Sequence, residues 1–260
     1  MDKFEFKKSL GQNFIKDDNI ISKIVNHANV DKDTLVIEIG PGAGSLSKKI
    51  IPLSGYSILY EIDIRLKDIL KEVLSGNNNY EIIFGDFLLQ DVYQDISKHN
   101  FKKTYVVANL PYYITTPIIT KLIDEIYPDR IMIMVQDEVA DRLSAKEGSR
   151  DYGMISALIG AKYEVKKLFK VSRSCFVPAP NVDSAVISLD KKKDVVSLNY
   201  KTYERLLKNA FLFKRKNLRN NLKMYDLDII NNKLKEYGYS LNNRAEEIPV
   251  NVWIELTKLL

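Results

Sequence analysis

Short apolar runs alternate with amphipathic stretches through the first 190 residues of the chain. Continuous apolar runs are typical of strands buried on both faces of a parallel sheet. Such runs lie at residues 35–39, 57–62, 80–84, 105–108 and 131–135. Two further strands are predicted at residues 163–171 and 185–190, where polar and apolar residues alternate. Strands separated by helical patterns predict an α/β fold with a Rossmann-like sheet.

Residues 191–260 show helical periodicity instead. We expect helices at about 200–213, 215–223, 228–237 and 250–260, with Gly238 and Pro249 as breaks between them. The run Lys-Lys-Lys-Asp at 191–194 is the expected linker. The pattern therefore predicts a Rossmann-like domain with an N-terminal arm over residues 1–190 and a small, all-helical domain over residues 191–260.

A glycine or a polar side chain stands at the carboxyl end of each of the first four predicted strands. In chain order these residues are Gly40, Glu61, Asp86 and Asn109. The carboxyl ends of parallel strands meet at one sheet edge, where open α/β sheets hold ligands. Each position alone is typical of an ordinary turn, but the ordered set predicts a ligand with a ribose and an adenine. The glycines are spaced G-x-G-x-G, which differs from the G-x-G-x-x-G fingerprint of dinucleotide-binding proteins. The predicted ligand has no phosphate that would need a basic loop, which favours S-adenosylmethionine over a nucleotide.

The segment Asn109-Leu110-Pro111-Tyr112 follows a buried strand and predicts a rigid set of acceptors beside an aromatic ring. The Asn109 side-chain oxygen and the Leu110 carbonyl are placed to accept hydrogen bonds from one exocyclic amine, because Pro111 fixes the backbone. Tyr112 would stack on the base that carries the amine. Phe176, on a proline-stiffened loop, would form a second wall. The alternatives are an ordinary turn at Asn109 and a core position for Phe176.

Composition narrows the class of protein. With 45% hydrophobic residues, a chain of 260 residues can fill a core, and no apolar segment approaches a membrane span. The N-terminus lacks a signal-peptide profile, so we expect a soluble, cytoplasmic protein. One cysteine and two distant histidines leave no recognisable metal site or Cys-His pair. We therefore expect catalysis without a metal.

Positive charge is concentrated near the C-terminus. Residues 191–260 carry 15 lysines and arginines against 8 acidic residues, whereas the remaining 190 residues carry 24 against 26. The densest cluster consists of Lys214, Arg215, Lys216, Arg219 and Lys223. Such a run is often a solvated helix face, but it also fits the polyanionic backbone of RNA.

Several motifs together resemble one family over nearly the full chain. They are GQNF at 11–14, EIGPGAG at 38–44, NLPY at 109–112 and FVPAPNVDS at 176–184. In this order they resemble the rRNA adenine N6,N6-dimethyltransferases, most closely the KsgA type, which dimethylates two adjacent adenosines near the 3′ end of small-subunit rRNA. The glycine motif alone is weak, but the four together are specific.

The resemblance implies a role for individual residues. The positions that would contact S-adenosylmethionine are Asn13, Ile15, Gly40, Glu61, Asp86 and Asn109. Asn109, Leu110 and Tyr112 would hold the target adenine, and Phe176 would stack on it. The basic C-terminal helices would dock on rRNA of the small ribosomal subunit, with the protein acting as a monomer. Methyl transfer would be direct and repeated, without a strong general base.

Three alternatives remain open from the sequence. The erythromycin-resistance methyltransferases share the arm, the glycine turn and the acceptor segment but act on large-subunit RNA. A catalytically idle RNA-binding or assembly factor is a second possibility, although the intact cofactor set favours an active enzyme. A methyltransferase for small molecules or proteins would leave the basic C-terminal region unexplained.

Overall fold

The computed structural model describes residues 12–193 and 198–260, and the chain divides into two compact units. The unit called here the sheet unit runs to Ala140 and resumes at residues 167–190. The helical unit comprises residues 141–166 together with the chain from Lys191 onward. The first part of the predicted arm, residues 1–11, and residues 194–197 beside the predicted linker lie outside the described residues.

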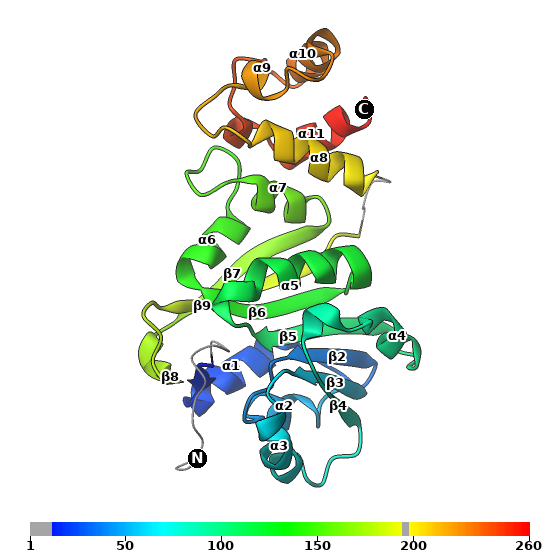
Figure 1. Ribbon diagram of the computed structural model, residues 1–260, viewed down its shortest axis with the longest axis vertical. Helices are drawn as coiled ribbons and strands as arrows, with labels where there is room; N and C mark the ends of the chain where they lie inside the picture. Colours follow the sequence, from blue (N-terminus) through cyan, green and yellow to red (C-terminus); the bar gives the residue numbers. More distant parts are fainter. Residues whose placement is uncertain (1–11, 194–197) are drawn as a thin grey trace. The chain divides into compact units, whose positions relative to one another are not determined.

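A seven-stranded sheet forms the centre of the fold, in the order β4-β3-β2-β5-β6-β9-β7 (Figure 1). Its strands are β2 (Thr34–Ile39), β3 (Tyr56–Glu61), β4 (Tyr80–Phe84), β5 (Lys103–Asn109), β6 (Arg130–Gln136), β7 (Tyr163–Val171) and β9 (Ser184–Lys191). The first five pair in parallel and β9 pairs antiparallel with β6. The prediction of a Rossmann-like sheet is confirmed, because the buried parallel strands are the continuous apolar runs of the sequence.

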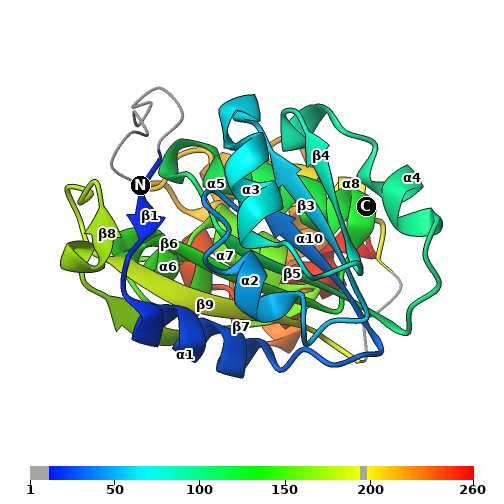
Figure 2. The ribbon, with the colours of Figure 1, turned by 90° about the horizontal axis from the view of Figure 1, so that it is seen from below.

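Helices of the sheet unit lie on both faces of the sheet. Apolar side chains of α1 (Asp18–Ala28) and α2 (Ser47–Ile50) form one cluster with Val36 of β2, and α3 (Lys67–Val73) packs against Leu59 of β3. Figure 2 shows α2 and α3 over β2 and β3. Tyr60 points the other way, where its hydroxyl donates to Asp95 of α4 (Val92–Ser97) at 2.9 Å. α5 (Thr115–Lys121) continues from β5 through a short turn.

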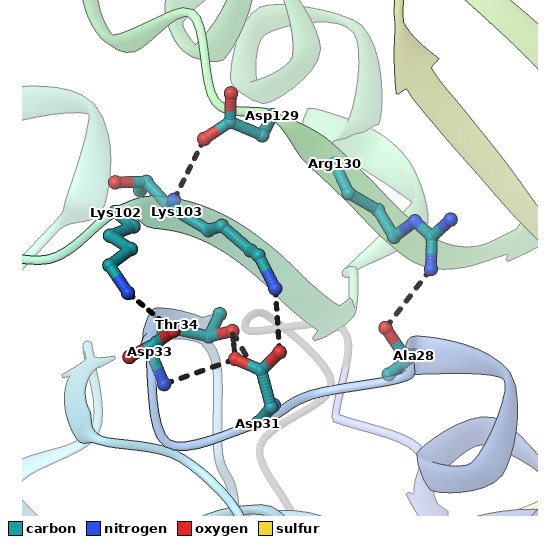
Figure 3. Close-up of polar contacts among 9 residues, drawn as sticks. Ala28, Asp31, Asp33, Thr34, Lys102, Lys103, Asp129 and Arg130 are labelled. Carbon is teal, nitrogen blue, oxygen red and sulfur yellow. Dashed lines mark hydrogen bonds and ion pairs between the residues drawn. The ribbon is translucent and has the colours of Figure 1, made fainter.

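Ion pairs and hydrogen bonds tie together the amino-terminal edge of the sheet (Figure 3). Lys102 pairs with Asp33 at 2.9 Å and Lys103 with Asp31 at 2.6 Å. The Arg130 guanidinium donates to the carbonyl of Ala28 at 3.2 Å. Exposed pairs of this kind contribute little each. These contacts join the amino-terminal ends of β2, β5 and β6. The carboxyl ends of the parallel strands, where ligands bind in open α/β sheets, lie at the opposite edge.

The helical unit has an apolar core of its own around Trp253, which is fully buried. Its helices are α6 (Asp137–Ser144, beginning in the sheet unit), α7 (Met154–Gly160), α8 (Tyr200–Ala210), α9 (Leu218–Asn221), α10 (Leu227–Glu236) and α11 (Val250–Thr257). The predicted C-terminal helices are present, but the one expected at 215–223 was wrong in length. Asn217 caps α9 by accepting from the Asn220 N–H, which places residues 215–217 in a loop.

Residues 141–166 belong to the helical unit, whereas the predicted domain boundary placed them with the sheet. The Tyr203 hydroxyl of α8 donates to the Ala157 carbonyl of α7 at 2.8 Å, and both residues lie in the core of this unit. The apolar face of α7 packs against the C-terminal helices, which draws residues 141–166 into the helical unit. Sequence periodicity predicts that this face is buried, but it does not indicate which element covers it. Among the described residues, no helix is long and apolar enough to cross a bilayer.

Candidate active site

A cavity lies at the carboxyl edge of the sheet, within the sheet unit. Its lining comes from the arm, the glycine turn, the end of β3 and the segment after β5. The residues are Gln12, Asn13, Phe14, Gly40, Gly42, Glu61, Ile62, Asn109, Leu110, Pro111 and Tyr112. None of these lining residues is a lysine or arginine, so the cavity does not suit a phosphate group.

The glycine turn brings backbone close to the arm. Gly40 and Gly42 have φ angles of +70° and +59°, a region that side chains with a Cβ rarely adopt. A Cβ built on Gly42 would lie 2.5 Å from the Phe14 ring. Glycine at position 42 therefore allows both the turn and the close approach of Phe14.

Glu61 links the turn to the end of β3. One carboxylate oxygen accepts the Gly42 N–H at 3.0 Å and the other accepts the Asp63 N–H at 2.8 Å. Burial raises the pKa of Glu61 above its ordinary value, although both hydrogen bonds oppose the rise. Each oxygen has a second acceptor position, as two vicinal hydroxyls of a ribose require.

A second carboxyl group, Glu38 on β2, is buried beside Glu61. Its side chain is 2% exposed, and Oε2 has no hydrogen-bond partner among the described residues. Burial raises the pKa of Glu38 to about 8; the Ser47 hydroxyl opposes this rise and the nearby Glu61 adds to it. Glu38 is thus held largely neutral near pH 7 and differs in charge from an ordinary glutamate.

The arm fixes the orientation of the Asn109 side chain. Nδ2 of Asn109 donates to the backbone carbonyl of Asn13 at 3.0 Å. A carbonyl only accepts, so it must face the nitrogen of the amide, and the Asn109 oxygen must point the other way. Gln12 holds the same part of the arm by donating to Asp63 at 2.9 Å. The arm therefore presents Asn109 Oδ1 as an available acceptor.

Tyr112 is held at its hydroxyl end. Its oxygen lies 2.7 Å from the hydroxyl of Ser184, a fully buried residue at the start of β9. Burial raises the pKa of Tyr112, so the phenol is neutral near pH 7. Next to it, the Leu110 N–H donates to the Met134 carbonyl of β6 at 3.2 Å. Both bonds restrain the acceptor segment on the side away from the cavity.

The structure brings together seven of the site residues predicted from the sequence. They are Asn13, Gly40, Glu61, Asn109, Leu110, Pro111 and Tyr112. Three others do not line the cavity. Ile15 and Phe176 are buried where β1 (Phe14–Ile15) pairs with β8 (Phe176–Val177), and Asp86 accepts the Leu88 N–H.

Sequence reasoning missed several residues of this site. Gln12, Phe14 and Gly42 fall within the quoted motifs, and Ile62 directly follows the predicted carboxylate, so position alone could have indicated all four. Ser184 also falls within a quoted motif, as the last residue of 176–184, but its bond to Tyr112 joins positions 72 residues apart and could not be predicted from the sequence.

The basic residues predicted to bind RNA all lie in the helical unit. Lys214, Arg215, Lys216, Arg219 and Lys223 are exposed there. Lys214 Nζ approaches the carbonyl of Arg150 at 3.5 Å, which adds a further cation to their surroundings. With residues 141–166 included, the helical unit carries 20 lysines and arginines against 12 acidic residues.

Comparisons with known proteins agree on one family. Ribosomal RNA small subunit methyltransferase A of Bacillus mycoides (strain KBAB4) is 40% identical over 268 aligned residues, covering 99% of this chain and 92% of that protein. The protein of the same name from Bacillus cereus (strain AH187) has the same identity and coverage. A crystal structure of a dimethyladenosine transferase from Plasmodium falciparum matches with a TM-score of 0.78 and 26% identity, covering 94% of this chain and 95% of that one.

Another solved structure, the 23S rRNA methyltransferase ErmE, shares the fold with a TM-score of 0.76 at 24% identity, covering 94% of this chain and 98% of that one. The family model described as Ribosomal RNA adenine dimethylase matches residues 3–260. With the glycine turn, the buried Glu61 and the Asn109–Tyr112 segment at one sheet edge, the chain belongs to the ribosomal RNA adenine dimethylase family.

Proposed function

We propose that this enzyme transfers methyl groups from S-adenosylmethionine to the N6 amines of two adjacent adenosines near the 3′ end of small-subunit rRNA, during ribosome biogenesis in the cytoplasm. It acts as a monomer on the small ribosomal subunit. The observation that carries the proposal is the Asn13–Asn109 hydrogen bond, which leaves the Asn109 side-chain oxygen available to a substrate amine.

The chemistry of the cavity fits S-adenosylmethionine. Glu61 offers acceptors to the ribose hydroxyls, and Gly40 and Gly42 leave room for close approach of a ligand to the backbone. Asn13 lines the same cavity. The absence of cations among its lining residues suits a positively charged sulfonium better than a phosphate. When bound, S-adenosylmethionine supplies the electrophilic methyl group.

The acceptor segment prepares the amine. An adenine amine is a poor nucleophile because its lone pair is delocalised into the ring. Asn109 Oδ1 and the Leu110 carbonyl accept its hydrogens out of the ring plane, which draws the nitrogen toward tetrahedral geometry and aims the lone pair at the methyl group. The proton leaves to water as the nitrogen is alkylated. In the second transfer the monomethylated amine has only one N–H, so it donates to only one of the two acceptors.

RNA binding and base extrusion precede the transfer. Removing the target base from its stack costs a few kcal/mol, and stacking on an aromatic ring offsets about 1–3 kcal/mol. Tyr112, anchored on Ser184, provides that ring. Phe176 was predicted as a second ring; its burial at the β1–β8 pair means that its stacking role requires the pair to open.

The test is Asn109→Ala in a labelled methyl-transfer assay on small subunits lacking the modification. We expect at least a hundredfold loss of transfer, with cofactor binding retained at Glu61, because the variant loses the acceptor for the amine. Asn19→Ala, an exposed position on α1, is the matched control and should transfer normally. Undiminished transfer by Asn109→Ala would contradict the proposed mechanism.

A further inference from the structure

The loop between α8 and α9 exposes two large apolar side chains among cations. Leu212 and Phe213 are each 58% exposed, and exposed Lys214, Arg215 and Lys216 follow them directly. No acidic residue occurs between Glu204 and Asp226 in the sequence. Covering exposed apolar side chains with a partner is favourable, because it removes apolar surface from water, and the surrounding cations favour a polyanionic partner.

The backbone of this loop is held in place. The side chain of Asn221 is buried, and its Nδ2 donates to the Ala210 carbonyl at 2.6 Å and to the Phe213 carbonyl at 3.3 Å. The Lys216 N–H also donates to the Phe213 carbonyl, at 2.9 Å. Because these bonds fix the carbonyl of Phe213, its exposed ring is presented by an ordered turn, which lowers the entropy lost on binding.

Phe211, two residues before Phe213, contacts the core of the helical unit and provides a comparison for the exposed Phe213. Its ring packs against Trp253 and Tyr152, with centroids 6.0 and 6.1 Å away. Phe213 lies outside the core cluster that includes Phe211. The Phe213 ring is therefore a surface group, and the partly buried Phe211 is the aromatic residue that joins this loop to the core.

We propose that Phe213, with Leu212 beside it, is a stacking platform for an unpaired base of the RNA, while Lys214, Arg215 and Lys216 contact the flanking phosphates. Aromatic rings interleaved with cations are the means by which proteins bind single-stranded nucleic acid. The proposal rests on the proposed function in taking RNA as the partner. It assigns this loop a contact separate from the methyl-transfer cavity, for a base that is not methylated.

Binding of the full-length chain to a short, fluorescent single-stranded oligoribonucleotide tests the platform, with a duplex of the same length for comparison. Phe213→Ala should weaken single-strand binding roughly tenfold with an unchanged salt dependence, because it removes stacking and no charge. Duplex binding should change little. Phe213→Trp should restore affinity, and its indole fluorescence should fall on binding. Leu89→Ala, an 83% exposed leucine of the sheet unit, is the control and should bind as the parent does.

Two results would overturn the platform: equal single-strand affinity of Phe213→Ala and the parent, or equal weakening of Phe213→Ala binding to single strand and duplex. None of these readouts depends on methyl transfer. A failure of the proposed function would instead appear as absent methylation by the parent enzyme, so the two failures are distinguishable.

Discussion

At the scale of single residues, the site depends on hydrogen bonds that leave specific atoms available. Asn109 and Tyr112 each bond to the protein at one end of the side chain, and in the proposed mechanism the other end contacts the substrate. The hydrogen bond between the Tyr112 hydroxyl and Ser184 holds the far end of the ring in place, so the ring cannot swing away from the cavity. Ser184 is therefore a positioning residue in this account, although it does not line the cavity.

Replacing either partner of that bond should have the same effect. Ser184→Ala and Tyr112→Phe should each lower kcat for methyl transfer roughly fivefold, equivalent to about 1 kcal/mol, with little change in KM for RNA. The double variant should be no slower than either single one, since all three lack the same bond. Steady-state kinetics and melting temperatures measure this. Additive losses in kcat, or a loss explained by a lower melting temperature, would contradict the positioning role.

Glu38 should make stability fall with rising pH. Its pKa of about 8 in the folded protein exceeds the ordinary value of 4.5, so the folded state binds the proton more tightly than the unfolded state. The free energy of unfolding should therefore decrease by roughly 1 kcal/mol per pH unit as pH rises from 4.5 to 8. Glu38→Gln, which cannot ionise, should match the parent at pH 5 and be more stable at pH 8.

Denaturant titrations without cofactor across that range measure the difference. Glu72→Gln, at an exposed position of α3, is the control for removing one negative charge. Should the Glu38→Gln and parent curves run parallel from pH 5 to pH 8, Glu38 is not held neutral.

Residue identity alone predicted part of the site. Glu61 and Asn109 were found because each ends a recognisable buried strand, and strand ends share one edge. Asp86 also follows a strand but does not line the cavity, and one of its oxygens accepts the Leu88 N–H, so its contact with the cofactor stays a prediction. For Phe176 the sequence left a stacking wall and a core position open, and its burial was not predictable because it depends on pairing with an arm about 160 residues earlier.

At the scale of elements, the glycine turn and the arm constrain one another. A side chain at Gly42 would be strained by its φ of +59° and would also meet the Phe14 ring. The arm carries Asn13, which sets the orientation of Asn109. A change at Gly42 should therefore be transmitted through Phe14 to the acceptor segment.

Gly42→Ala should displace the arm. We expect a loss of affinity for S-adenosylmethionine of more than tenfold and lower methyl transfer, because a Cβ 2.5 Å from the ring forces Phe14 to move. Gly76→Ala is the matched control: its φ is +90°, but a Cβ there meets nothing within 4 Å. Gly76→Ala should lower the melting temperature without weakening the binding of S-adenosylmethionine. Scanning and titration calorimetry measure the two quantities. A Gly42→Ala affinity equal to that of Gly76→Ala would show that the contact with Phe14 does not control cofactor binding.

Elements of the sheet were predictable and those of the basic segment less so. Five apolar runs predict the parallel strands, and in four of them the central residues are buried on both faces, whereas β4 at the edge of the sheet is half-buried. The stretch 215–223 looks helical by composition, but helical bonds are confined to Leu218–Asn221. The Asn217 cap and the Asn221 side chain stabilise a loop before this helix, through bonds that composition does not show.

At the scale of the whole molecule, charge is divided between the two units. The sheet unit has 19 lysines and arginines against 22 acidic residues, whereas the helical unit has an excess of eight cations. In the proposed function the sheet unit binds the cofactor, and the net positive charge of the helical unit attracts RNA. The sequence showed the basic excess of residues 191–260, but it did not show that residues 141–166 join the same unit, because that depends on packing between α7 and α8.

The most direct test of the account is labelled methyl transfer from S-adenosylmethionine to small ribosomal subunits that lack the modification, beside protein-free large-subunit rRNA. The account predicts label on the small subunit, recovered as N6,N6-dimethyladenosine at two adjacent positions near the 3′ end of its rRNA. Label on the large-subunit rRNA alone, or on neither substrate while the cofactor still binds, would contradict it.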